Sequence, residues 1–365
     1  MIEVKSTGLV YRNPKPYLRS IHAWHPTIVP LGNGGMLAGF DLAEAISAAN
    51  YRSYMARSND GGRTWSEPQR LVPGHTEITD FIRLSRLSDG TLIGVGQRKQ
   101  PDLETQSWNP ETYGCRPGEW FTIRSADNGE TWSGTEVFEP AITGQPWEHC
   151  HAALETADGR LLLPAALVRT WEGEAPNGLK TVALVSHDRG ATWPDSVGLF
   201  SDPEGETFHH EVSLIELPDG GLLAVAWPFN PGVGRTVTKV PFALAPDGGD
   251  FTVRGSTEIP GETTKLVALG GNRVMSFMRR TDQPGLWACV SRIEGDRWIN
   301  EAEAPVWQGA DSRMLGDGRA AEELAGLQFG FPNPHLLEDG DVFVAFWCLE
   351  DCIHNIRWVR VGVEQ

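Results

Sequence analysis

The chain contains the octapeptides SNDGGRTW at residues 58–65, SADNGETW at 125–132 and SHDRGATW at 186–193. Ser, Asp, Gly, Thr and Trp occupy the same offsets in all three copies, which start 67 and 61 residues apart. Self-similarity at such a spacing is typical of a supersecondary unit that is repeated along the chain and packs against its neighbours. The sequence therefore predicts a repeat protein.

Each octapeptide has the composition of a self-contained β-turn. The Asp, as at Asp60, can accept hydrogen bonds from amides of the turn, and the Gly, as at Gly62, allows a positive φ. The Thr favours an outgoing strand, and the Trp can cover the turn. Two weaker copies follow, APDGGDF at residues 245–251 and SRIEGDRW at 291–298, the second with Ile293 in place of the Asp. The five turns resemble the Asp-box, or BNR, repeat of the sialidase (neuraminidase) superfamily, which implies a β-propeller with each box between the third and fourth strands of a blade.

Six segments combine a short apolar run, a two-residue turn with Gly, and a second apolar run. Asp-Gly or Asn-Gly between such runs is the strongest local signal for a β-hairpin. The segments cover residues 26–40, 81–96, 152–168, 212–227, 266–278 and 334–347. Six inner hairpins predict an all-β fold, a six-bladed β-propeller with four antiparallel strands in each blade, and a single domain over residues 1–365.

The ends of the chain are expected to share one blade. An open ring would leave an unpaired strand edge, so residues 2–11 are predicted to pair with the strand that contains residues 356–363. No segment shows the helical periodicity needed for a second domain. Residues 100–118 and 308–330 form longer connections than usual, and such loops in a compact domain are typically lids or binding loops.

The composition limits the partners. Lys and Arg number 31 against 48 Asp and Glu, so the formal net charge is −17, which disfavours nucleic acids and anionic membranes. No apolar run reaches membrane-spanning length, and the first residues lack the basic and apolar regions of a signal peptide. The five cysteines show no CxxC pairing, so we expect reduced thiols and a cytoplasmic protein. A small molecule or an oligosaccharide remains the expected ligand, and the oligomeric state stays open.

Titratable side chains gather at one face of the predicted ring, opposite the boxes, where first strands start and second strands end. Eight of the ten His residues fall there. First strands start at residues 22–25, 75–83, 148–151, 209–211, 262–265 and 333–335, and second strands end at 41–44, 98–99, 169, 227–230, 279–280 and 347–351. Such clustering at one mouth indicates a functional site. The structural alternative is that strand starts are generally polar and that His residues cap buried strand ends.

The family's catalytic pattern is matched only in part. Sialidases bind the substrate carboxylate with three Arg, use a Tyr nucleophile paired with a Glu, and have an Asp acid/base. Here Trp24 stands where the first Arg would lie, residues 46–54 contain no Asp, and residues 331–335 contain no Tyr. Only Glu211 falls where the Glu of the fourth blade is expected. The resemblance therefore implies a sialidase-like branch that acts on other sugars or has no assigned activity, and not an exo-sialidase.

Carboxylates and imidazoles at the mouth suggest proton transfer on a sugar. Glu211 is the leading acid/base candidate, because the neighbouring His209 and His210 can set the protonation of a carboxyl. His149 completes the predicted catalytic set, and the alternative for Glu211 is a carboxylate satisfied by nearby amides. A hydrolase needs a second carboxylate across the mouth. The options for it are Asp80, Glu148 and Asp41.

Guanidinium and indole groups would hold the substrate. Arg side chains can bind a carboxylate in bidentate fashion, which would fit an acidic sugar such as a uronate, or they can be counterions to the carboxylates of the mouth. Trp side chains can offer flat apolar faces to a pyranose ring. The predicted substrate-binding residues are Arg83, Arg98, Arg280, Trp24, His25, Asp80, Trp227, Asn333 and His335.

A metal site is a further option. His149 and His151 lie two residues apart, so on a strand they would project from the same face. Additional ligands for a divalent transition metal would come from His25, His75, His210 or His335. No local motif has an established metal-ligand spacing, and the other interpretations require no cofactor.

The sequence favours a glycoside hydrolase that acts at the axial mouth on a non-sialic sugar, with an acidic, uronic sugar as one option. The nearest alternative is a uronate lyase, in which Arg neutralises the carboxylate while His or Tyr withdraws the C5 proton. A noncatalytic sugar-binding or scaffold propeller is the alternative from a different class.

Overall fold

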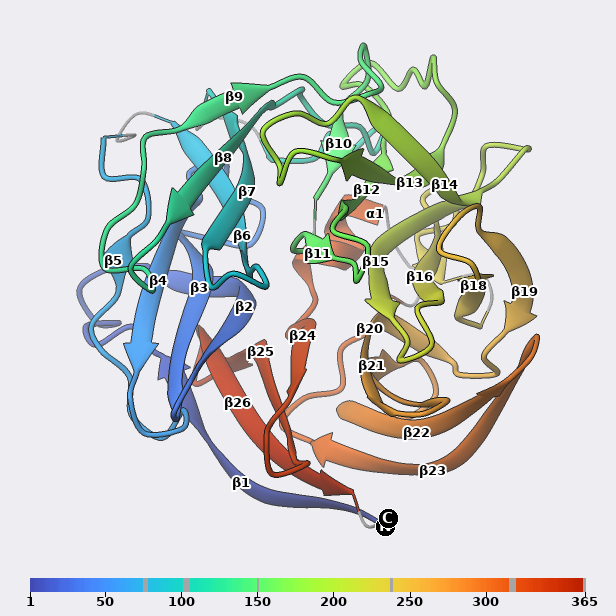
Figure 1. Ribbon diagram of the computed structural model, residues 1–365. Helices are drawn as coiled ribbons and strands as arrows, with labels where there is room; N and C mark the ends of the chain where they lie inside the picture. The colour runs from blue at the N-terminus through green and yellow to red at the C-terminus, as the bar shows by residue number, and fades with distance from the viewer. Residues whose placement is uncertain (75–77, 101–105, 150, 237–238, 315–319, 364–365) are drawn as a thin grey trace.

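Six antiparallel sheets form a ring around a central axis (Figure 1). The computed structural model describes residues 1–74, 78–100, 106–149, 151–236, 239–314 and 320–363. In each sheet a path of four strands leads from the axis outward. The predicted six-bladed β-propeller is confirmed.

The blades follow one another along the chain. Blade 1 contains β2 (His22–Gly32), β3 (Gly35–Ala43), β4 (Arg52–Ser58) and β5 (Gln69–Arg70), and blade 2 contains β6 (Thr79–Arg86), β7 (Leu92–Lys99), β8 (Glu119–Ser125) and β9 (Glu136–Phe138). Blade 3 contains β10 (Trp147–Glu148), β11 (Leu154–Glu155), β12 (Leu161–Leu167), β13 (Lys180–Ser186) and β14 (Asp195–Ser201). Blade 4 contains β15 (Phe208–Glu216), β16 (Leu222–Asn230), β17 (Arg235–Thr236), β18 (Pro241–Ala245) and β19 (Thr252–Ser256). Blade 5 contains β20 (Gly261–Gly270), β21 (Arg273–Arg280), β22 (Leu286–Glu294) and β23 (Arg297–Trp307).

Blade 6 joins the two ends of the chain. It contains β24 (Phe329–Leu336), β25 (Val342–Glu350), β26 (Ile353–Val363) and, as its outermost strand, β1 (Ile2–Tyr11). Ile2 pairs with Val363 and Tyr11 pairs with Ile356, as predicted. The ring is thus closed by hydrogen bonds between the first and last strands, which lie side by side in Figure 1.

The repeated octapeptides form the turns between third and fourth strands. In the first, Asp60 Oδ1 accepts hydrogen bonds from the amides of Arg63 at 3.0 Å and Thr64 at 2.9 Å. Ser58 Oγ accepts from the Gly62 amide at 2.9 Å. The Thr64 hydroxyl donates to Asp60 Oδ2 at 2.6 Å, so this Thr stabilises the turn rather than a strand. The other two strict copies repeat these hydrogen bonds. The Asp carboxylate accepts from the amide and hydroxyl of the Thr, and the Ser hydroxyl oxygen accepts from the Gly amide.

The box glycines also set the distance between blades. A Cβ on Gly62 would lie 2.5 Å from the Phe343 ring, and a Cβ on Gly129 would lie 2.7 Å from Leu37. In both cases the contacted side chain belongs to the second strand of the preceding blade. A Cβ on Gly190 would likewise lie 2.8 Å from Ile93. The hydrophobic core accordingly lies between adjacent sheets, where apolar side chains of neighbouring blades form shared clusters.

The one α-helix in the described ranges, α1 (Ala320–Ala325), belongs to the long connection between blades 5 and 6. It lies near the centre of the ring in Figure 1. No helix among the described residues is long and apolar enough to cross a membrane. Cys115, Cys289, Cys348 and Cys352 are free thiols, and Cys150 lies outside the described residues.

Candidate functional site

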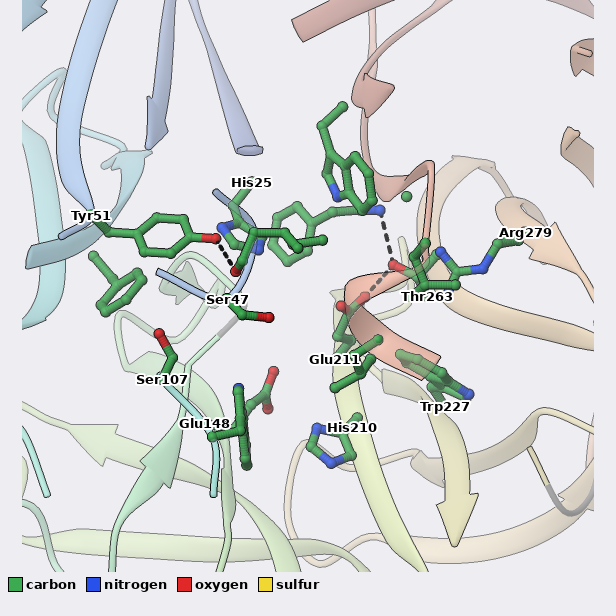
Figure 2. A pocket seen from close by; sticks show the side chains of 18 of the residues that line it. His25, Ser47, Tyr51, Ser107, Glu148, His210, Glu211, Trp227, Thr263 and Arg279 are labelled. Carbon is green, nitrogen blue, oxygen red and sulfur yellow. Dashed lines mark hydrogen bonds between the residues drawn. The ribbon is translucent and has the colours of Figure 1, made fainter. Parts of the chain in front are cut away.

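A cavity of about 170 Å³ opens at the mouth where first strands start and second strands end (Figure 2). Its side chains come from the inner strands and from connections that reach over the axis. The two connections predicted as lids or binding loops supply Gln106, Ser107, Trp108, Tyr113, Leu324 and Leu327. We call this space the mouth cavity.

The same β-bulge recurs in four of the first strands. Register with the second strand shifts after Trp24, His210, Glu262 and Gly330, and resumes at Thr27, Ser213, Lys265 and Asn333. The first bulged residues are His25, Glu211, Thr263 and Phe331, with φ between 46° and 51°. All four line the mouth cavity. A β-bulge re-aims side chains and is common beside active sites, so these bulges are the local cause of the site's geometry.

Hydrogen bonds tie three of the bulges together. The Thr263 hydroxyl donates to Glu211 Oε2 and accepts from the Phe331 amide at 3.0 Å. Lys265 Nζ donates to the Glu211 carbonyl oxygen at 2.7 Å. The carboxylate of Glu211 is therefore oriented from the next blade and points into the mouth cavity (Figure 2). The structural alternative was a Glu211 carboxylate satisfied by nearby amides. The carboxylate instead accepts a hydrogen bond from the Thr263 hydroxyl.

His210 lines the cavity but lies within an aromatic cluster with Trp108, Tyr113, Phe208 and Phe229. Burial, and then the nearby His209, lowers the pKa of His210 to about 3. Its Nε2 has no hydrogen-bond partner among the described residues. His210 is therefore a neutral imidazole at physiological pH, and its lowered pKa makes it a weak base.

Arg279 lines the mouth cavity. The sequence placed it at a strand end of the mouth, but Arg280 was the predicted contact. Arg279 Nε donates to Glu262 Oε2 at 2.7 Å and its Nη1 to the Phe329 carbonyl at 2.6 Å. Its Nη2 has no partner in the part of the chain that is described. The guanidinium lies over the Trp227 ring, 5.4 Å from the centroid. Trp227, a predicted contact, also lines the cavity.

The three predicted anion-binding Arg residues do not line the mouth cavity. Arg83 is buried and donates from Nη1 to Asp41 Oδ2 at 3.0 Å. Arg98 pairs with Glu119, and Arg280 pairs with Asp282 and Glu303, both at 2.7 Å. Their geometry corresponds to the counterion alternative, since each guanidinium is engaged by a carboxylate of the protein.

Two further predicted contacts are structural. Trp24 is fully buried in the core and stacks on His22, because it lies before the bulge and not within it. Asp80 is also fully buried; it pairs with Arg70 at 2.6 Å and accepts from the Ser53 amide at 2.7 Å. Neither side chain lines the mouth cavity.

Among the proposed second carboxylates, Glu148 is the one that lines the mouth cavity. It comes from blade 3 and lies across the cavity from Glu211 in Figure 2. Asp41 is fully buried and accepts hydrogen bonds from Arg83, His25 and Ser53. Burial opposes its ionisation, but Arg83 and His25 hold the pKa of Asp41 below its ordinary value. Glu148 and Glu211 thus form the carboxylate pair of the site.

Asn333, His335 and His151 line a different space. They line a channel of about 780 Å³ between the first strands of the blades. Asn333 Oδ1 accepts from the Ile28 amide at 2.7 Å, and His335 Nε2 lies 3.1 Å from it. These predicted contacts therefore do not meet Glu211.

The geometry assumed for the metal site is not observed. His149 and His151, on either side of residue 150, which is not described, both lie outside strands β10 and β11, so they do not project from one strand face. His151 lines the channel and His149 a separate pocket. No group of three or more potential His, Cys, Asp or Glu ligands occurs in the described ranges, and His75 lies outside them.

Tyr51 is another contact that the sequence did not reveal. Its hydroxyl donates to the Ile46 carbonyl at 2.5 Å, and burial raises the pKa of Tyr51 well above its ordinary value. Ser107 joins the same region, because its amide donates to the Ser47 carbonyl at 3.1 Å. Tyr51 is thus a neutral side chain that lines the cavity, and its hydrogen bond holds the loop that contains Ile46.

A signal for the missed bulge residues is present in the sequence. His25, Phe81, Glu211 and Phe331 each stand eight positions before the first residue of their hairpin turn, and Thr263 stands seven before its own. All five line the mouth cavity. Alignment of the six hairpins on their turns would have identified Thr263 and Phe331 together with Glu211.

Residues 23–227 match the family model of the BNR repeat-like domain. The chain belongs to this family. The BNR-family chain is also 27% identical over 220 residues, 54% of its length, to a sialidase from Micromonospora viridifaciens, and the match spans 31% of that protein.

Solved structures share the fold of this BNR-family chain. A protein of unknown function from Dyadobacter fermentans superimposes with a TM-score of 0.72 at 20% identity, covering 100% of this chain and 99% of that one. The Trypanosoma rangeli sialidase in complex with sialic acid gives 0.65 at 13% identity, over 94% of this chain and 55% of the sialidase. NanB sialidase from Streptococcus pneumoniae gives 0.66 at 12% identity, over 97% and 70%. The fold is that of sialidases.

Proposed function

We propose that the protein is a glycoside hydrolase that binds one non-sialic sugar ring in the mouth cavity. The observation that carries the proposal is the pair Glu211 and Glu148, which both line this cavity. Glycoside hydrolases use two carboxyl groups on either side of the scissile bond, one as general acid and one as base or nucleophile. Glu211, oriented by Thr263, is the acid/base in this assignment.

The cavity walls fit a single sugar. Its volume of about 170 Å³ is below the roughly 300–1,000 Å³ of pockets for drug-sized ligands. Phe81, Phe331 and Trp227 line it and can pack against the apolar face of a pyranose. Trp227 is held in place, since its Nε1 donates to Thr236 Oγ1 at 2.7 Å. This arrangement supports recognition of one ring at a time.

An uncharged sugar agrees best with the charges at the site. Arg83, Arg98 and Arg280 are paired with carboxylates of the protein, whereas Glu148 and Glu211 both face the cavity. Carboxylates repel an anionic substrate.

One observation favours a second candidate, a lyase acting on a uronate. Arg279 lines the cavity with a partner-free Nη2 in the described structure, which could bind a sugar carboxylate. His210 lines the same cavity, but a pKa of about 3 makes its imidazole a weak base for the C5 proton, so the lyase stays the second candidate. Such a reaction would give an unsaturated product that absorbs in the near ultraviolet.

The test is a screen of aryl glycosides of neutral sugars and of uronates with the wild-type chain and with Glu211→Gln, Glu148→Gln and the exposed control Glu136→Gln. General acid–base catalysis contributes about 10²- to 10⁴-fold, so the first two changes should lower kcat by that factor and the control should not. Unchanged turnover in Glu211→Gln would contradict the assignment. Saturable binding without any product would instead indicate a noncatalytic sugar-binding propeller.

A further inference from the structure

A second, smaller space adjoins the mouth cavity between blades 1, 2 and 3. It has a volume of about 130 Å³ and shares His25, Phe81, Ser107, Trp108 and Glu148 with the mouth cavity. Its other lining residues are Arg83, Gln97, Lys99, Cys115, Trp147 and His149. We call it the side pocket.

The side pocket collects buried polar atoms without partners. Arg83, Gln97 and His149 are 1%, 3% and 6% exposed. Within the described residues, Arg83 Nε, Gln97 Oε1 and both ring nitrogens of His149 have no hydrogen-bond partner. Each unsatisfied buried group costs about 1–3 kcal/mol, and native structures rarely leave several together. Something polar is therefore expected to fill this pocket.

Two of these side chains are held toward the pocket by their other atoms. Arg83 Nη1 is bonded to Asp41, and Gln97 Nε2 donates to the Trp147 carbonyl at 3.3 Å. The free atoms are thus presented by anchored groups. This preorganisation is typical of a binding site, since little conformational freedom remains to be lost when a ligand arrives.

The free atoms are a mixture of donors and acceptors. Arg83 Nε donates, Gln97 Oε1 accepts, and a neutral imidazole offers one of each. Burial, and then the charge of Arg83, lowers the pKa of His149 to about 3, so the ring is neutral near pH 7. A simple anion would lack a donor for Gln97 and would meet the carboxylate of Glu148, and a cation would meet the charges of Arg83 and Lys99. Hydroxyl groups both donate and accept hydrogen bonds, so they can satisfy the free atoms of Arg83, Gln97 and His149.

We propose that the side pocket binds the hydroxyl groups of a saccharide, supplied by a sugar unit linked to the ring in the mouth cavity. This inference rests on the proposed function in that it makes the substrate a disaccharide or the end of a glycan. At about 30 Å³ for each water, the pocket would hold roughly four waters, a space closer to part of a sugar ring than to a single hydroxyl. Trp147 and Trp108 provide apolar walls beside the polar atoms.

The experiment measures binding separately from hydrolysis. The full chain is applied to an array of immobilised neutral and uronic monosaccharides and of the disaccharides that these sugars terminate. The variants are Gln97→Leu, which removes the free acceptor, and His149→Phe, which keeps a ring but removes its nitrogens. The control is Gln69→Leu, the same substitution at an exposed position of β5. Thermal unfolding of each variant verifies that it is folded.

We expect wild type and Gln69→Leu to prefer disaccharides, and Gln97→Leu and His149→Phe to lose about tenfold in affinity for disaccharides only. An equal loss on monosaccharides would overturn the role of a second sugar unit, because the ring in the mouth cavity would then supply the hydroxyls. No loss for either folded variant, or no wild-type binding to any glycan, would overturn the proposal. A preference for disaccharides without hydrolysis would contradict the proposed catalysis but support saccharide binding in the side pocket.

Discussion

Glu211 has a backbone conformation that an ordinary residue avoids. Its φ of 46° is in the left-handed region, where a residue with a Cβ is strained by about 1–3 kcal/mol. His25, Thr263 and Phe331 share this conformation and line the same cavity. Strain at the same bulge in four blades, each time beside the mouth cavity, is the expected signature of a site selected for function.

Replacement of Glu211 by Gly should separate stability from activity. Gly adopts a positive φ without strain, so Glu211→Gly should leave the free energy of unfolding unchanged or raise it by up to about 1 kcal/mol. Turnover or ligand binding should be lost. Ile215→Gly, in the same strand and without a positive φ, is the control and should destabilise. Urea unfolding measures both, and a large loss of stability in Glu211→Gly would contradict the strain argument.

Sequence reasoning found Glu211 from the family position, but it selected Arg280 where Arg279 faces the cavity. Side chains alternate along a strand, so a choice between adjacent residues requires the register of the strand. The bulge in β20 lies between Glu262 and Lys265, and it shifts the register so that Glu262 pairs with Arg279. The bulge in turn depends on contacts between blades, such as Thr263 with Glu211. Local patterns do not contain this information.

Among the elements, the turns were the most predictable. The Asp-Gly and Asn-Gly hairpins and the boxes are stabilised by bonds within a few residues, such as Ser125 Oγ with the Gly129 amide at 2.8 Å. These turns can therefore be predicted from the sequence. The split of the first strand of blade 3 into β10 and β11 was not predicted, and with it the assumption about His149 and His151 was wrong.

The box glycines offer a test of packing between blades. Gly129 and Gly159 have nearly equal φ values of 84° and 85°, but only Gly129 has a neighbour where a Cβ would be, Leu37 at 2.7 Å. Both Gly→Ala substitutions should lower the free energy of unfolding through backbone strain. Gly129→Ala should lower it by about 1–3 kcal/mol more than Gly159→Ala, because the added methyl group also overpacks against Leu37. Equal losses in chemical denaturation would show that the blades can separate slightly at no cost.

At the scale of the molecule, buried and half-buried imidazoles link stability to pH. Burial lowers the pKa of His149 and His210 to about 3, and that of His151, His209, His335 and His354 to about 4. The unfolded chain takes up these protons near pH 6.5 and the folded chain does not. Stability is thus fully present above pH 6.5 and is lost as pH falls toward 4.

The free energy of unfolding should accordingly decline by up to about 1.4 kcal/mol per pH unit for each of these imidazoles between pH 6.5 and 4. His335→Gln, which removes one titrating group from the channel, should make the decline shallower. His187→Gln, at an exposed position of a box, is the matched control and should leave the slope unchanged. Urea unfolding at several pH values gives the slopes, and identical slopes for wild type and His335→Gln would contradict the assignment.

The closure of blade 6 has a consequence for how the chain is made. β1 emerges from the ribosome before the other strands of the ring, and its partner β26 follows only after the other blades. The two strands make contacts such as Arg357 to Thr7, which are 350 positions apart. Contacts this distant in sequence form slowly. During synthesis β1 therefore carries an unpaired edge while five sheets assemble, and the nascent chain depends on that edge staying unpaired until the last strand arrives.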